Sequence, residues 1–178
     1  DGTYPMSTID DKATRILRLI FRTAMNSSRP WGSFTSEEHY NVARTVAQEG
    51  IVLLKNETNK KEEAVLPLDG NKYHSILVVG ENAIRRLTEG GGSSVLKVKK
   101  EVSPLAGLQS KFGDKIKYTM GYASGKPAYD HEMKPDFNTD SLHQEAVKQA
   151  ADADLIVFVG GLNKNNFQDC ENADRKSL

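Results

Sequence analysis

The densest group of side chains that could do chemistry lies near the end of the 178-residue sequence. Three carboxylates and an arginine fall within seven positions there: Asp169, Glu171, Asp174 and Arg175. A carboxylic acid whose pKa is raised can protonate the oxygen of a leaving group, which makes the cluster a candidate for general acid/base chemistry. Asp174 and Arg175 could instead form an ion pair that holds a loop. On residue types alone, a solvated polar loop is the stronger interpretation.

A second candidate loop runs from Glu81 to Ser94 and includes the run Gly90-Gly91-Gly92-Ser93-Ser94. Backbone N–H groups and hydroxyls in such a run can hold a ligand. The run lacks the glycine spacing of a phosphate-binding or dinucleotide-binding loop, so composition favours a flexible turn. Glu81 follows a predicted strand, where we favour a capping role over a catalytic one.

Other kinds of site find no support in the sequence. The four histidines show no metal-ligand spacing, and Cys170 is the single cysteine, so neither a zinc site nor an internal disulfide is expected. No Gly-x-Ser-x-Gly elbow is present. The 24 basic and 24 acidic residues balance, which argues against nucleic acid or an anionic membrane as the main partner. No apolar run approaches the length of a bilayer span.

The elements that must position these residues alternate between helices and strands. Apolar periodicity predicts helices over residues 7–24, 36–48, 104–112 and 140–151. Continuous apolar runs predict buried strands over residues 51–54, 76–80 and 155–160, and an alternating segment predicts another over 115–120. This pattern indicates the α/β class, with a mostly parallel sheet flanked by helices on both faces. Ligands bind such sheets at the carboxyl ends of the strands, where the loops 81–94 and 161–178 begin.

The order of several segments resembles glycoside hydrolase family 3. The resemblance rests on Ala47 to Asn56, which ends in Leu-Leu-Lys-Asn, on Val78 to Ala83, and on Gly91 to Ser94. Further segments agree in order: Ile9 to Lys12 with Arg15 to Arg18, Leu66-Pro67-Leu68 and Ser103-Pro104-Leu105. The family joins a TIM-type barrel to an α/β sandwich domain. The resemblance thus implies that residues 1–34 are the last barrel helix plus a linker, and residues 35–178 the N-terminal part of the sandwich.

The resemblance also implies an activity, that of a retaining exo-acting β-glycosidase, with β-glucosidase favoured. In the family the nucleophile is a barrel aspartate, which we expect outside this chain. The acid/base glutamate precedes an Asp-Arg pair, and Glu171 matches it, although Asn172 stands where a glycine is usual. Gln168 and Asp169 are its competitors. Asp174 and Arg175 would support the loop.

The remaining expectations follow from the same resemblance. Gly92, Ser93 and Ser94 would contact the sugar, while packing is favoured over sugar stacking for the aromatic residues Trp31, Tyr122 and Phe167. No metal or cofactor is implied. The partners would be a β-linked oligosaccharide or glucoside and the barrel and remaining sandwich segments of the same protein; a homodimer stays open. Any signal peptide would precede Asp1, so we favour a periplasmic or secreted protein.

The fragment alone should be inactive. The alternatives are a β-xylosidase or related exo-β-glycosidase, and a non-catalytic flavodoxin-like module.

Overall fold

The computed structural model describes residues 2–58, 63–85, 96–123 and 138–161. The chain divides into two compact units, Asp1–Val52 and Leu53–Leu178. The expected domain limit between residues 34 and 35 stays a prediction.

The first unit contains two helices, α1 (Met6–Arg22) and α2 (Glu37–Gly50). Both were predicted within two residues of their observed limits. α2 begins at a Ser36 cap, whose hydroxyl accepts a hydrogen bond from the His39 N–H at 3.3 Å, and Glu37 and Glu38 lie in its positively polarised first turn. In the part of the chain that the structure describes, no helix combines the length and apolarity needed to cross a membrane.

Within its described residues, the second unit is built on a parallel sheet of three strands, ordered β2-β1-β3. The strands are β1 (Ile76–Val79), β2 (Ile116–Thr119) and β3 (Leu155–Phe158). Ile76 pairs with Ile116 on one side and with Leu155 on the other, so β1 is the central strand. Its four residues are buried. The prediction of a parallel α/β sheet is confirmed.

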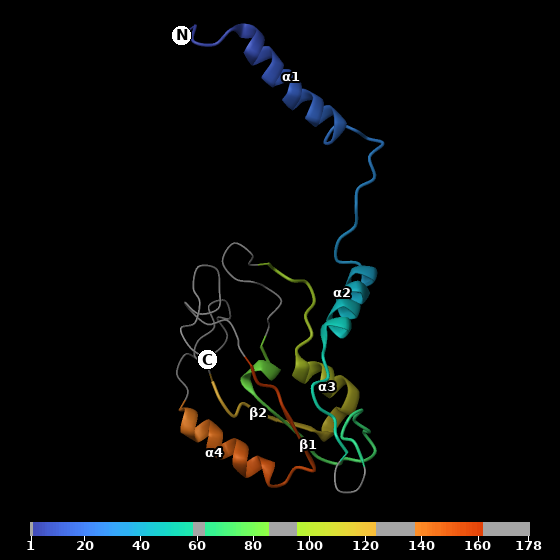
Figure 1. Ribbon diagram of the computed structural model, residues 1–178, viewed down its shortest axis with the longest axis vertical. Helices are drawn as coiled ribbons and strands as arrows, with labels where there is room; N and C mark the ends of the chain where they lie inside the picture. Colours follow the sequence, from blue (N-terminus) through green and yellow to red (C-terminus); the bar gives the residue numbers. More distant parts are fainter. Residues whose placement is uncertain (1, 59–62, 86–95, 124–137, 162–178) are drawn as a thin grey trace. The chain divides into compact units, whose positions relative to one another are not determined.

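Two helices connect the strands and lie on opposite sides of the sheet, as Figure 1 shows. α3 (Pro104–Phe112) leads from β1 to β2, and α4 (Thr139–Ala150) leads from β2 back past β1 to β3. Because strand–helix–strand connections are right-handed, two crossovers in opposite directions must use opposite faces. Short 3-10 helices follow β1 (η1, Glu81–Ala83) and α3 (η3, Gly113–Lys115).

The strand predicted over residues 51–54 is wrong. These residues form no strand, and Leu54 is 92 % exposed. A short apolar run is compatible with a buried strand but does not specify one. An extended segment also needs a neighbouring strand for its backbone hydrogen bonds, and no described strand pairs with this one.

Burial of the sheet on both faces is likewise only partly observed. Ile156 and Phe158 of β3 are 49 % and 65 % exposed, whereas all of β1 is buried. α3 and α4 pack against β2 and the β1 region. β2 and β3 are the two edge strands of the described sheet. Ile156 and Phe158 pair with Leu77 and Val79 of β1, and that face packs against Ala146 of α4. α4 therefore covers this face over β1 and β2 but leaves the two β3 side chains largely exposed.

Candidate active site

The two loops predicted to form a site begin side by side at one edge of the sheet. β1 and β3 are neighbours, so their carboxyl ends meet there. The connection after β1 runs to one face, while β3 is reached across the opposite face, and a reversal of this kind opens a ligand crevice in doubly wound sheets. The Val159 N–H donates to the Val79 carbonyl at 2.7 Å and joins the two strand ends beyond the last paired residues.

Gly80 makes this close approach sterically allowed. Its φ of +134° favours glycine, and a Cβ at this position would lie 2.2 Å from the Val159 carbonyl oxygen. The residue therefore lets the chain leave β1 directly against the end of β3. On its other side, the Gly80 N–H donates to the Thr119 carbonyl of β2 at 3.2 Å.

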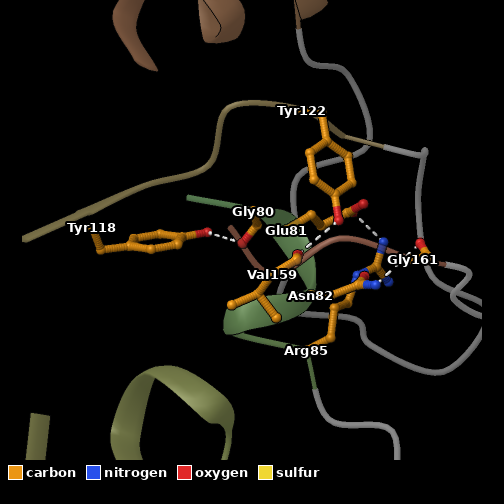
Figure 2. A network of polar contacts seen from close by, with 8 residues as sticks. All are labelled: Gly80, Glu81, Asn82, Arg85, Tyr118, Tyr122, Val159 and Gly161. Carbon is orange, nitrogen blue, oxygen red and sulfur yellow. Dashed lines mark hydrogen bonds and ion pairs between the residues drawn. The ribbon is translucent and has the colours of Figure 1, made fainter. Parts of the chain in front are cut away.

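A network of polar side chains surrounds the two strand ends (Figure 2). Asn82 donates through Nδ2 to the Gly161 carbonyl at 3.1 Å. The Tyr122 hydroxyl donates to the Val159 carbonyl at 3.0 Å. The Tyr118 hydroxyl donates to the Gly80 carbonyl at 3.3 Å. Each of these side chains holds a backbone carbonyl at the start of one of the two loops.

A buried ion pair lies within the same network. Arg85 donates through Nη2 to Glu81 Oε1, one helical turn earlier in the sequence, and both side chains are almost fully enclosed. Removing one partner of such a pair leaves an uncompensated buried charge, so the two residues depend on each other. Their contact fixes the chain that follows β1, including η1 and Asn82.

The two tyrosines remain protonated donors over the whole ordinary pH range. Burial raises the pKa of Tyr118 to about 12, with the nearby Glu81 charge adding to the rise. Burial also raises the pKa of Tyr122; the Glu81 charge acts in the same direction, and a hydrogen bond from the Asn82 backbone and the Arg85 charge oppose it.

The predicted site residues themselves lie outside the described residues. These are Glu171, Asp174 and Arg175 in one loop, and Gly92, Ser93 and Ser94 in the other. The competitors Gln168 and Asp169, and Phe167, lie outside them as well. The structure does bring together the first residues of both loops, Gly80 to Arg85 and Val159 to Gly161. The site residues stay predictions.

Sequence reasoning missed the supporting network. Glu81 was interpreted as a capping acid, and it is instead the buried partner of Arg85. The four-residue spacing of this acid and base was a usable signal. Nothing in the sequence indicated the bond from Asn82 to Gly161, because 79 positions separate the two residues. Among the described residues, no three His, Cys, Asp or Glu side chains gather closely enough to hold a metal ion.

Comparison with known proteins assigns the family. Residues 51–178 match the family model described as "Glycosyl hydrolase family 3 C-terminal domain". The chain belongs to glycoside hydrolase family 3. A family 3 relative from Bacteroides ovatus, named beta-glucosidase BoGH3A, is 56% identical over 178 residues, which is 99% of this chain and 24% of that protein.

Two further comparisons find relatives that are named as glycosidases. A protein of Formosa agariphila named beta-xylosidase is 29% identical over 97% of this chain and 23% of its own length. A solved β-glucosidase structure, EmGH1 from Erythrobacter marinus, superimposes with a TM-score of 0.59 at 33% identity, over 79% of this chain and 20% of that one. The chain thus spans about a quarter of the length of the two curated relatives, from Bacteroides ovatus and Formosa agariphila.

Proposed function

We propose that this chain is part of a retaining exo-acting β-glycosidase, a β-glucosidase, and that it supplies the acid/base carboxyl. The observation that carries the proposal is the junction of β1 and β3, where the two loops with the predicted site residues begin in direct contact. Membership of family 3 supports the reaction class.

In the proposed reaction, Glu171 acts twice. As a carboxylic acid it gives its proton to the glycosidic oxygen while the bond from that oxygen to the sugar C1 breaks and the nucleophile's carboxylate bonds to C1. As a carboxylate it then takes a proton from the water that attacks C1, which releases the sugar and frees the nucleophile. We propose that the nucleophile is an aspartate on the barrel, outside this chain.

The choice of glucose rests on sequence similarity. The relative that is 56% identical is named a beta-glucosidase, whereas the one named a beta-xylosidase is 29% identical. The full-length enzyme should therefore hydrolyse 4-nitrophenyl β-D-glucoside faster than the β-D-xyloside, compared as kcat/KM. The reverse order would favour a β-xylosidase.

The role of Glu171 is tested by Glu171→Ala in the full-length enzyme. We expect kcat on 4-nitrophenyl β-D-glucoside to fall about 10²–10⁴-fold, the range of general acid/base catalysis. Azide should restore turnover and yield glucosyl azide, because a small anion can attack C1 without a general base. Asp169→Ala, which removes the neighbouring carboxylate, is the matched control. If Asp169→Ala shows the azide-rescued loss and Glu171→Ala does not, the assignment is wrong.

A further inference from the structure

The exit from β3 is held by two side chains that come from other parts of the sheet edge. Gly160 is flanked by Val159 and Gly161, and the carbonyls of both neighbours accept side-chain hydrogen bonds. Tyr122, three residues beyond the end of β2, donates to one, and Asn82 in the turn after β1 donates to the other. Figure 2 shows both donors converging on this short stretch.

These bonds lie beyond the ordinary pairing of the sheet. The last paired residues of β1 and β3 are Val79 and Phe158, and one further backbone bond follows from Val159. The next two residues are Gly160 and Gly161, and glycine backbones can adopt a wide range of φ and ψ angles. Gly161 has a φ of +134°. The bonds to Val159 and Gly161 therefore restrict a direction that the backbone alone would leave open.

The two donors are themselves well fixed. Asn82 is 7 % exposed and belongs to η1, next to the buried pair of Glu81 and Arg85. The Tyr122 ring packs against Phe158 of β3, with ring centroids 5.9 Å apart and planes tilted by 43°. A donor that is locked by packing and by neighbouring bonds positions its acceptor more tightly than a solvated one.

We propose that Asn82 and Tyr122 are positioning residues, which set the direction in which the chain leaves β3 toward Glu171 and thereby align the proton-donating carboxyl. Glu171 follows Gly161 by ten residues. The inference rests on the proposed acid/base role of Glu171. Since a misplacement of about 1 Å can slow an enzyme about 10²-fold, loss of either bond should be visible in the step that needs the proton.

The experiment compares single variants of the full-length enzyme on substrates that differ in their need for acid catalysis. Phenyl β-D-glucoside has a poor leaving group that must be protonated, whereas 2,4-dinitrophenyl β-D-glucoside expels a stable anion without help. Asn82→Ala and Tyr122→Phe should lower kcat/KM on the phenyl glucoside by about 10–100-fold, and on the dinitrophenyl glucoside by less than about 3-fold.

Tyr118→Phe is the matched control. It deletes the same hydroxyl from a half-buried tyrosine of the same network, but its bond goes to Gly80 at the end of β1 and not to β3. In Tyr118→Phe, the ratio of kcat/KM on the phenyl glucoside to kcat/KM on the dinitrophenyl glucoside should therefore stay at its wild-type value. Because Tyr122→Phe removes a single oxygen atom, it keeps the test valid even where Asn82→Ala fails to fold.

A double variant then asks whether Asn82 acts through Glu171. If it does, adding Asn82→Ala to an enzyme that already carries Glu171→Ala should not lower kcat/KM on the phenyl glucoside any further. The positioning role would be overturned if Asn82→Ala and Tyr122→Phe lowered kcat/KM equally on both glucosides. It would also be overturned if Asn82→Ala lowered kcat/KM as much in the double variant as it does alone. If Glu171→Ala lowers kcat/KM equally on both glucosides, the acid/base assignment itself is wrong. If Glu171→Ala lowers kcat/KM mainly on the phenyl glucoside but Asn82→Ala does not, only the positioning role is wrong.

Discussion

At the scale of single residues, Gly80 has the tightest environment at the candidate site. A Cβ there would lie 2.2 Å from the Val159 carbonyl oxygen, and φ is +134°. Gly80→Ala must therefore push β1 and β3 apart or strain the turn. We expect it to lower the free energy of unfolding by about 2–4 kcal/mol, from strain and overpacking together. Urea denaturation of the full-length protein, followed by fluorescence, measures this.

Gly107→Ala provides the control for that substitution. Gly107 lies within α3, and the nearest atom to an added Cβ is Val102 Cγ1 at 3.9 Å. The space is sufficient, and alanine is the better helix former. The free energy of unfolding should rise by about 0.5–1 kcal/mol. A Gly80→Ala protein with the same free energy of unfolding as wild type would contradict the close contact between Gly80 and the Val159 carbonyl.

At the scale of elements, Asp154 joins the starts of two parallel strands. Its Oδ2 accepts hydrogen bonds from the N–H groups of His74, at 2.8 Å, and Ser75, at 3.0 Å. His74 and Ser75 lead into β1, and Asp154 immediately precedes β3. The bonds from the two N–H groups lower the pKa of Asp154 below its usual 3.8.

This lowered pKa gives a definite pH dependence of stability. A carboxyl whose pKa is depressed by folding stabilises the protein fully above its ordinary pKa, and the effect is lost as the pH falls through the folded-state value. Wild type should therefore be more stable than Asp154→Asn at neutral pH, and the difference should shrink as the pH drops below 3.8. Urea midpoints from about pH 6 to about pH 3 test this. Asp152→Asn, which changes an exposed carboxylate two residues away, is the control; a difference that does not change with pH would contradict the argument.

Most elements of the second unit were predictable because their signals are local. Ser103 followed by Pro104 marks the start of α3, and the Ser103 hydroxyl caps the Ala106 N–H at 3.2 Å. The apolar runs of β1 and β3 were equally clear, whereas the run over residues 51–54 was not a strand. Whether an apolar run becomes a strand depends on a pairing partner, and the sequence does not reveal that partner.

The candidate site shows the same difference between local signals, which the sequence reveals, and long-range contacts, which it does not. That the loops after β1 and β3 would both begin at the carboxyl ends of parallel strands followed from the alternation of strands and helices and a general rule for α/β sheets. That β1 and β3 are neighbours was shown only by the structure. The side chains that hold these loops did not follow. The Tyr122 bond spans 37 positions in sequence and depends on the exact exit of two strands. Long-range bonds of this kind have no signature in a single sequence.

At the scale of the whole molecule, this chain spans 24% of the relative that is 56% identical to it. A retaining mechanism needs two carboxyl groups about 5–5.5 Å apart. Under the proposed function, one is Glu171 and the other belongs to a barrel outside these 178 residues. Substrate would then be held between two parts of a longer polypeptide, and neither part alone could complete the double displacement.

The 178-residue chain by itself should therefore not hydrolyse glycosides. Release of 4-nitrophenol from 4-nitrophenyl β-D-glucoside, measured at equal molar concentrations of the chain and the full-length enzyme, should stay at the buffer rate for the chain. Circular dichroism of the same sample must show folded protein, so that inactivity reflects the missing carboxyl and not unfolding. Glu171→Ala in the chain controls for a contaminating enzyme. Turnover by the chain that this substitution abolishes would place both carboxyls within residues 1–178 and contradict the division of the site between two domains.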